Sequence, residues 1–420
     1  MPTPPLHLAL PAVPDASGTL PPRPLKVLDI TDFYSEGASG GVKVYLRQKA
    51  RYLAMAGIEH VLVVPGEEDR VTREGPTEVY RVRGPEVVVS PDYRVMTSVD
   101  TVERILREER PDVIEVGSPF LVPRLVRTAV SRISGYRPAT IGFYHADIVR
   151  TFAEPYVPHR IAAPVRVLAR MAARWLVRRV YRRLDLTVAA SASVASELRE
   201  LGVPRVEHVS LGVDLDTFRP MTAAETGPRH ALGLPEDGRP IGVFVGRFCA
   251  EKRLDVILRG HAQLSEQERP HLVFVGEGPL SDWLRGMASE QPGVTVLPYL
   301  ADRTSVARVY AAADFYLAVG PGETFGLSIA EGIASGLPAV TVDRGAAPDR
   351  VAGSDIAEFY AHGEPDSAAG ALRRMTERFE HGEAARLRAA ARAHAEREFD
   401  WSNTFSEMIR LYRDRIPTAV

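Results

Sequence analysis

The sequence predicts an α/β protein of two doubly wound, Rossmann-like domains. Short apolar runs rich in Val and Ile alternate with longer amphipathic segments from Lys26 onward. The runs are continuously apolar, which is typical of parallel strands that are buried on both faces. The pattern begins again after Pro220, and 420 residues are enough for two hydrophobic cores.

The first domain is predicted over residues 25–212, after a disordered, proline-rich tail at 1–24. Its strands are KVLDI, HVLVVPG, DVIEVGSP, ATIGFYHA and LTVAAS, which cover 26–30, 60–66, 112–119, 139–146 and 186–191. Helices are expected over 43–57 and 98–110, because apolar residues there recur every three or four positions. Such βαβ units build a parallel sheet.

The second domain is predicted over residues 213–398, following a turn-rich junction at 211–220. Its strands are PIGVFVGR, HLVFVGEG, VTVLPYL, DFYLAVG and PAVTVD, which cover 240–247, 271–278, 294–300, 314–320 and 338–343. A last helix, opened by Asp400 or Ser402, is expected within 399–420 and should pack back on the first domain.

Composition narrows the classes of function. The net charge of −2 provides no field that would attract nucleic acid. The single cysteine, Cys249, excludes an internal disulfide framework and suits a reducing cytoplasm. Residues 1–24 lack the basic start of a signal peptide, and no apolar run is long enough to span a membrane. We therefore expect a cytoplasmic protein, with at most peripheral contact with the inner face of the membrane.

Two glutamates, Glu323 and Glu331, flank a Phe-Gly-Leu turn after the predicted strand 314–320, and the stretch between them contains no cation. Gly326 would let a ligand approach the backbone closely, and a helix beginning near Leu327 would present free amides to an anion. Backbone amides can donate hydrogen bonds to phosphate oxygens, and carboxylates can accept hydrogen bonds from sugar hydroxyls. The combination therefore suits a sugar diphosphate. The alternative is a loop glutamate and a helix-surface glutamate that merely face solvent.

A pair of cations, Arg247 and Lys252, favours the sugar diphosphate. Both lie with Gly246 in GRFCAEKR, directly after the predicted strand 240–245. An arginine fork and a compact lysine charge can together neutralise a diphosphate. Alone they would be ordinary surface cations. Because ligands bind beyond the carboxyl ends of parallel strands, their position near the Glu323 loop predicts a shared site.

Several motifs in order resemble the retaining glycosyltransferase family 4, which has the GT-B fold of two Rossmann-like domains facing each other across a cleft. They are Glu323-TFGLSIA-Glu331, GRFCAEKR, FVGEGPL, LGVDLDTFRP and EFDWSNTF. The resemblance covers about Leu25 to Tyr412. Gly332 replaces a usual Ala and Asp349 a usual Glu.

The resemblance implies a role for each site residue of the second domain. Arg247 and Lys252 would contact the diphosphate, Glu331 the ribose and Glu323 the donor sugar. The remaining donor-binding residues would be Gly246, Gly276, Glu277, Pro298, Phe325, Gly326 and Leu327. For Gly276, plain turn chemistry is the alternative.

Two loops of the first domain would complete the site. Gly40 and Gly41 open the first helix and resemble the family's glycine loop beside the donor phosphates. They lack the G-x-G-x-x-G spacing of dinucleotide binders, which weakens a dehydrogenase interpretation. The stretch GFYHADI, at the end of the strand predicted over 139–146, carries His145 and Asp147, and His145 matches the family's strand-end histidine near the donor sugar. A purely structural histidine is the alternative.

A basic amphipathic helix is predicted over residues 160–183, with arginines every four residues. Such a helix can bind an anionic membrane surface. A helix packed on the first domain with solvated arginines is the alternative.

The resemblance implies a retaining transfer of a hexosyl unit, of mannose or glucose type, from a nucleotide diphosphate sugar to a glycolipid or glycan hydroxyl. Within the family, the chain looks like the bacterial branch that uses GDP-mannose. No metal or other cofactor is expected, since the cations would replace it. The alternatives are a GT-B epimerase or hydrolase of nucleotide sugars, and a non-catalytic scaffold of a polysaccharide assembly system.

Overall fold

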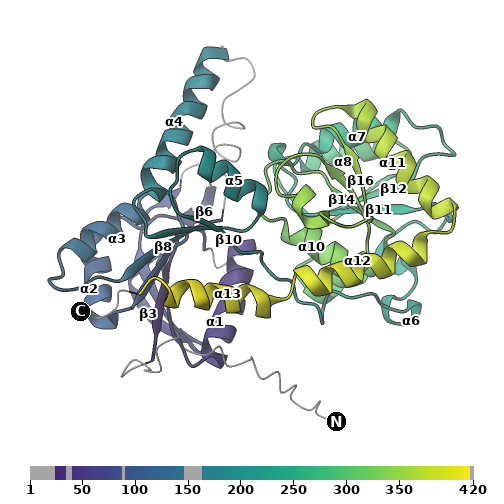
Figure 1. Ribbon diagram of the computed structural model, residues 1–420. Helices are drawn as coiled ribbons and strands as arrows, with labels where there is room; N and C mark the ends of the chain where they lie inside the picture. Colours follow the sequence, from purple (N-terminus) through teal and green to yellow (C-terminus); the bar gives the residue numbers. More distant parts are fainter. Residues whose placement is uncertain (1–23, 35–39, 88–89, 146–162, 417–420) are drawn as a thin grey trace, which may run out of the picture.

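The computed structural model describes residues 24–34, 40–87, 90–145 and 163–416. It contains two α/β domains that lie side by side, each built on its own mainly parallel sheet (Figure 1). This is the GT-B architecture that the sequence resemblance implies. The predicted tail at 1–24 lies almost entirely outside the described residues.

The first domain has a sheet of eight strands in the order β10-β9-β8-β7-β1-β2-β4-β3, in which only β3 runs antiparallel. Its elements are β1 Lys26–Ile30, α1 Gly41–Met55, β2 Glu59–Gly66, β3 Arg70–Glu74, β4 Thr77–Arg83, β5 Glu86–Val87, β6 Ser90–Arg94, α2 Val99–Glu109, β7 Val113–Val116, α3 Val122–Ser131, β8 Ala139–Tyr144, α4 Ala163–Tyr181, β9 Leu186–Ala189, α5 Ala192–Glu200 and β10 Val206–His208. The strand order reverses between β1 and β7.

The second domain has six parallel strands in the order β13-β12-β11-β14-β15-β16, which reverses between β11 and β14. Its elements are α6 Ala223–Thr226, η2 Arg229–Leu232, β11 Ile241–Val245, η3 Ala250–Lys252, α7 Leu254–Ala262, β12 His271–Val275, α8 Ser281–Glu290, β13 Val294–Leu297, α9 Arg303–Ala312, β14 Phe315–Ala318, α10 Leu327–Ala334, β15 Ala339–Val342, η4 Pro348–Val351, β16 Ala357–Tyr360, α11 Pro365–Glu380 and α12 Ala384–Glu398.

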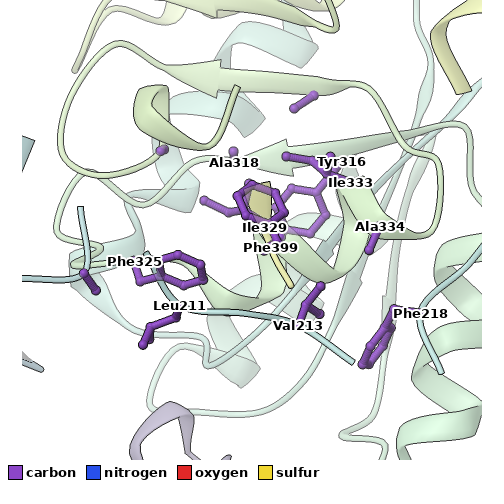
Figure 2. Packing of buried hydrophobic residues seen from close by; sticks show 14 of the residues in the cluster. Leu211, Val213, Phe218, Tyr316, Ala318, Phe325, Ile329, Ile333, Ala334 and Phe399 are labelled. Atoms are coloured by element: carbon purple, nitrogen blue, oxygen red, sulfur yellow. The ribbon is translucent and has the colours of Figure 1, made fainter. Parts of the chain in front are cut away.

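The chain passes between the domains twice, and the two crossings lie against each other. Residues 211–218 form the first, and its Leu211, Val213 and Phe218 pack near α10 and Phe399 (Figure 2). The Val213 amide donates to the Phe399 carbonyl over 2.8 Å. A Cβ on Gly212 would lie only 2.5 Å from the Trp401 nitrogen, so glycine permits this close approach.

The last helix, α13 (Trp401–Arg413), lies against α1 of the first domain (Figure 1). Asp400 caps it by accepting a hydrogen bond from the Ser402 amide. Its buried side is aromatic: Phe405 lies 5.7 Å from the Tyr45 ring, and Tyr412 donates a hydrogen bond to Glu115. The first domain therefore contains the last helix of the described chain.

Around Glu115 lies a buried polar cluster in the core of the first domain. Lys49 of α1 pairs with Asp29 of β1 over 2.8 Å and with Glu115 of β7 over 2.9 Å. His60 of β2 also contacts Asp29, over 2.7 Å. Burial is the main cause that raises the pKa of Glu115, to about 7, although Lys49 opposes it. The cluster ties β1, β7, α1 and α13 together.

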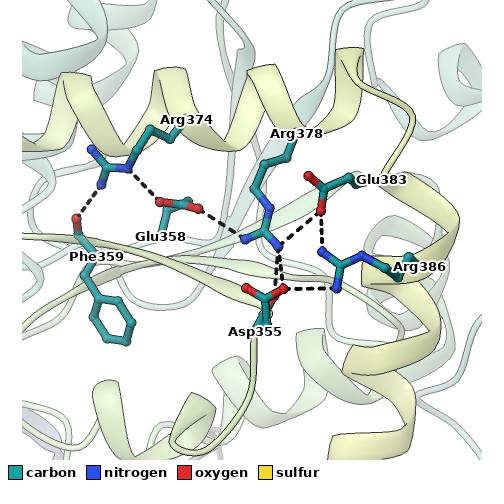
Figure 3. A network of polar contacts seen from close by, with 7 residues as sticks. All are labelled: Asp355, Glu358, Phe359, Arg374, Arg378, Glu383 and Arg386. Carbon is teal, nitrogen blue, oxygen red and sulfur yellow. Dashed lines mark hydrogen bonds and ion pairs between the residues drawn. The ribbon is translucent and has the colours of Figure 1, made fainter.

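On the surface of the second domain, a network of ion pairs joins α11 and α12 to the edge of the sheet (Figure 3). Arg378 of α11 contacts Glu358 over 3.1 Å and Asp355 over 3.2 Å. Arg386 of α12 also pairs with Asp355, over 3.0 Å.

No helix of the described residues has the length and apolar character needed to cross a bilayer.

Candidate active site

The centre of the candidate site is an ion pair between Lys252 and Glu323. Lys252 ends η3, in the loop after β11, and Glu323 lies in the loop after β14. These two strands are neighbours at the point where the strand order reverses, and such switch points form the ligand crevice of a doubly wound sheet. Lys252 Nζ donates a short hydrogen bond to Glu323 Oε1.

The environment keeps Lys252 charged. Its side chain is only 15% exposed, and that of Glu323 is 22% exposed. Burial by itself would lower the pKa of Lys252, but Glu323 and Glu251 raise it above its ordinary value. A Cβ on Gly320 would lie 3.1 Å from Lys252 Cδ, so this glycine leaves room for the lysine stem.

Arg247, the other predicted cation, lies in the same loop but is exposed. Within the described part of the chain its guanidinium forms no ion pair. The loop after β11 thus carries one cation held by a carboxylate and one that can engage an incoming anion.

The Phe-Gly-Leu turn has the geometry of an anion site. Gly326 adopts the left-handed conformation (φ 83°) and caps α10, which begins at Leu327. Its carbonyl accepts from the amides of Ile329 and Ala330. The amides of Gly326, Leu327 and Ser328 donate to no group among the described residues, and helix amides of this kind attract negative charge. Phe325 is buried beneath them, 4.2 Å from the Arg350 guanidinium.

Glu331 is separate from Glu323, one turn inside α10. Its side chain is 9% exposed and pairs over 2.8 Å with Arg303, the first residue of α9. Burial raises the pKa of Glu331, and Arg303 opposes that shift. The stretch between the glutamates contains no cation, but the fold supplies one to each of them: Lys252 to Glu323 and Arg303 to Glu331.

Sequence reasoning missed Arg303. It opens α9, three residues after the predicted strand 294–300, so the strand-end rule that selected Arg247 and Lys252 also applies to it. Its guanidinium lies 4.7 Å from the Phe218 ring, in the junction between the domains.

The loops after β12 and β13 lie beside the Arg247 loop. The Gly276 amide donates to the Leu297 carbonyl over 3.2 Å, and the Phe248 amide donates to the Glu277 carbonyl over 3.0 Å. A Cβ on Gly276 would lie 2.0 Å from the Gly246 carbonyl oxygen. The Gly246 backbone thus leaves no room for a side chain at position 276, whereas Glu277 and Pro298 are exposed.

The first domain reaches this site at two points. A Cβ on Gly41, at the start of α1, would lie 3.0 Å from Leu327 Cδ1 at the start of α10. At the end of β8, the His145 carbonyl accepts a 2.7 Å hydrogen bond from Thr324 Oγ1. Gly40 caps α1 and is exposed. The glycine loop and the strand-end histidine therefore both face the loop that carries Glu323.

His145 is held as a neutral ring. It stacks on Phe143 with 4.2 Å between ring centroids. Burial is the main cause that lowers the pKa of His145, to about 3, and Lys49 adds to the effect. At neutral pH the ring carries no charge, and it has one nitrogen that can donate a hydrogen bond and one that can accept a hydrogen bond. Asp147, the other polar residue predicted here, lies outside the described residues.

Among the described residues, no three His, Cys, Asp or Glu side chains come close enough to hold a metal ion. The groups at the site are cations, amides and two carboxylates, and the His145 carbonyl adjoins the loop that carries Glu323. This set can bind a diphosphate together with polyhydroxylated groups.

Comparison with known proteins identifies the family. The Glycosyltransferase Family 4 model matches residues 39–217, and the Glycosyl transferases group 1 model matches residues 239–378. A GDP-mannose-dependent alpha-mannosyltransferase of Mycobacterium tuberculosis (strain CDC 1551 / Oshkosh) is 30% identical over 74% of this chain and 77% of its own. The chain belongs to glycosyltransferase family 4.

The glycosyltransferase has further relatives of similar length. A GDP-mannose-dependent alpha-(1-6)-phosphatidylinositol dimannoside mannosyltransferase of M. tuberculosis (strain ATCC 25177 / H37Ra) is 29% identical over 92% of this chain and 95% of its own. Two solved structures share the fold. Sucrose-phosphate synthase from Thermosynechococcus elongatus has a TM-score of 0.74 at 19% identity, covering 93% of this chain and 98% of its own. Anabaena HepE, solved with UDP and glucose, has a TM-score of 0.68 at 17% identity, covering 93% and 100%.

Proposed function

We propose that this glycosyltransferase is a retaining hexosyltransferase that uses a nucleotide diphosphate sugar, with GDP-mannose as its first candidate donor, and that its acceptor is a hydroxyl of a glycolipid or glycan. The observation that carries the proposal is the Lys252–Glu323 ion pair at the switch point of the second sheet. The donor class follows the GDP-mannose-dependent relatives, and the lipid acceptor follows the phosphatidylinositol dimannoside mannosyltransferase.

Each part of the site has a role in binding the donor. Lys252 and Arg247 neutralise the diphosphate, assisted by the amides at the start of α10. Glu331 accepts hydrogen bonds from the ribose hydroxyls, and Glu323 accepts from the sugar. The neutral ring of His145 approaches the sugar from the first domain.

In the proposed reaction, the bond between the anomeric carbon and the β-phosphate oxygen breaks, and a bond from the acceptor oxygen to that carbon forms on the same face. The acceptor proton passes to the departing phosphate oxygen, so the products are a nucleoside diphosphate and a glycoside. Charge develops on that oxygen in the transition state, where Lys252, Arg247 and the α10 amides stabilise it.

Because these cations balance the diphosphate, we also propose that transfer needs no metal ion and no other cofactor. The single cysteine, Cys249, and the use of a nucleotide sugar favour a cytoplasmic reaction. Transfer that is unchanged in excess EDTA is expected, whereas activity restored only by a divalent cation would contradict this part of the proposal.

The test is a donor panel of GDP-mannose, UDP-glucose and ADP-glucose, each with and without phosphatidylinositol mannosides as acceptor. We expect one donor to release nucleotide only when acceptor is present, and NMR of the product to show the anomeric configuration of the donor. Release without acceptor would favour the hydrolase or epimerase alternative. Donor binding without turnover across a wider acceptor panel would favour the scaffold.

A further inference from the structure

Helix α4 carries large apolar side chains that are exposed to solvent and are not packed into the core of the domain. Leu168, Met171 and Trp175 are 66%, 61% and 60% exposed. Their spacing of three and four residues places them on one side of the helix, and we call them the apolar stripe. Val177 and Tyr181, near the other end, are buried against the sheet instead. Figure 1 shows the first half of α4 projecting away from the body of the domain.

The same region concentrates positive charge. Helices α3 and α4, with the two residues that follow Tyr181, contain nine arginines and no acidic residue, in a chain whose net charge is −2. A solvated helix usually balances its arginines with acidic neighbours, as Arg104 and Arg107 do with Glu108 and Glu103 on α2. Neither helix contains an acidic residue that could balance this charge.

Between α3 and α4 lies a groove of about 750 Å³. Its apolar walls include Phe120, Leu121, Leu176 and Val180, and four arginines enter it: Arg124, Arg127, Arg179 and Arg183. These four, which we call the groove arginines, form no ion pair within the described ranges. Repulsion, chiefly from Arg127 and then from Arg179 and Arg182, lowers the pKa of Arg183. Cations that repel one another around an apolar groove are suited to an anion with an apolar tail.

One contact connects the groove to the apolar stripe. The Arg179 guanidinium lies over the Trp175 ring, 5.1 Å from its centroid. A ligand that spans the two would therefore meet cations first and then an exposed aromatic and aliphatic surface. Tryptophan and arginine in this order are typical of the boundary between lipid headgroups and acyl chains.

We propose that α4 and the α3–α4 groove bind the surface of an anionic phospholipid bilayer. In this arrangement a lipid phosphate lies among the groove arginines, and the apolar stripe lies in the outer acyl layer. A second copy of the chain is a poorer occupant, because two such cationic faces would repel each other. A neutral apolar ligand would leave the arginines unbalanced. The binding requires no donor, so it can be tested separately from the transfer reaction.

Vesicle sedimentation of the full chain tests the proposal. We expect binding to phosphatidylcholine vesicles containing 30% phosphatidylglycerol to be at least tenfold stronger than binding to pure phosphatidylcholine, and to weaken as salt increases. Equal binding to both vesicles, or to neither, would overturn it.

Trp175 reports where the stripe lies. Of the three tryptophans, Trp175 is 60% exposed, Trp283 is 38% exposed and Trp401 is buried. Anionic vesicles should shift the emission to the blue, and lipids brominated on the acyl chain should quench it. Trp175→Phe should abolish both signals but retain binding. If the signals survive that change, the stripe is not the inserted surface.

Paired variants separate headgroup from acyl contacts. Arg127→Gln with Arg183→Gln should weaken anionic-vesicle binding at least tenfold, and so should Leu168→Ser with Met171→Ser. The control is Arg259→Gln with Arg285→Gln, which removes the same charge from exposed positions of the second domain and should leave binding within twofold. An equal loss in the control would mean a non-specific charge effect and would overturn the assignment of the groove.

Two further outcomes count against the bilayer. Glycerol phosphate that binds at the groove arginines, with no vesicle binding, would indicate a site for a free anion. Sedimentation that shows a dimer dissociated by Leu168→Ser with Met171→Ser would make a second copy the occupant. The melting temperature of every variant should stay within about 2 °C of the parent chain, since the changed side chains are exposed.

Discussion

The Lys252–Glu323 pair shows how one contact can organise a site before any ligand arrives. Each side chain is mostly buried, and each would be costly to bury alone. The pair joins the loops after β11 and β14, so the lysine is already positioned where the diphosphate is proposed to bind. Pre-organised charge of this kind acts without reorganisation during the reaction.

Replacing Lys252 by Ala is expected to lower kcat for transfer about 10²-fold or more, because a charge beside the departing phosphate is lost. Steady-state kinetics on the preferred donor would measure this effect. Arg285→Ala, which removes an exposed cation of α8 that pairs with Asp282, is the control and should retain full activity. Near-normal kcat for Lys252→Ala would remove Lys252 from the proposed mechanism.

A second test at the scale of single residues concerns Arg303, which pairs with Glu331. Arg303→Ala should weaken donor binding about tenfold, because a buried Glu331 without its cation is more easily protonated and then accepts hydrogen bonds poorly. Calorimetry with the donor's nucleoside diphosphate would show the change. In a double-mutant cycle with Glu331→Gln, the two losses should be clearly less than additive. Additive losses would mean that the two residues act independently.

The sequence was sufficient to locate most of this site, because the ends of parallel strands mark it. Lys252 and Glu323 follow clear apolar runs, and they meet where the strand order reverses. Their direct contact could not be predicted, since it depends on β14 crossing to lie beside β11. Arg303 was overlooked because it belongs to no motif, and only the fold brings it to a glutamate 28 residues away.

At the scale of elements, the second domain depends on backbone contacts between loops. Gly276→Ala should destabilise the protein by more than about 2 kcal/mol, because the added Cβ would lie 2.0 Å from the Gly246 carbonyl. Gly286, inside α8, has open space around its Cβ position. Gly286→Ala should therefore stabilise by about 0.5–1 kcal/mol, the usual gain in helix propensity.

Thermal unfolding of the two glycine variants would test this contrast. Opposite shifts in melting temperature are expected for the same added methyl group. Similar shifts would mean that the loops after β11 and β12 can move apart at little cost.

The ten predicted strands are all present, because each is a mainly apolar run, and all of them except β13 are largely buried. The six strands that were missed lack this pattern. Buried and exposed residues alternate in much of β4, β3 is mostly exposed, and β6 contains a proline and two charged residues. β5 has two residues, β10 has three, and β16 is an edge strand with only Tyr360 buried. The basic helix was predicted over 160–183, and the structure describes α4 over Ala163–Tyr181. The sequence did not show which of its apolar residues would remain exposed.

At the scale of the whole molecule, Glu115 links stability to pH. Its pKa is raised to about 7 by burial, so the folded state holds a proton that the unfolded state has lost above about pH 4.5. This contribution is therefore fully present below pH 4.5, falls as pH rises towards 7, and is constant above that.

Glu115→Gln removes this titration and retains the shape of the side chain. The stability of the parent chain minus that of Glu115→Gln should fall by up to about 3 kcal/mol between pH 4.5 and 7. Urea unfolding across this range would measure the difference. A difference that does not change with pH would mean that Glu115 is ionised throughout.

The position of α13 has a consequence for how the protein is made. The first domain leaves the ribosome first, but Tyr412, which completes the cluster around Glu115, is synthesised only after the whole second domain. Until then Glu115 lacks the hydrogen bond from Tyr412, and the side of α1 that carries Tyr45 and Tyr52 is not covered by Phe405. During translation the first domain therefore stays incompletely folded while the second domain folds. Its core is completed only when α13 has been synthesised.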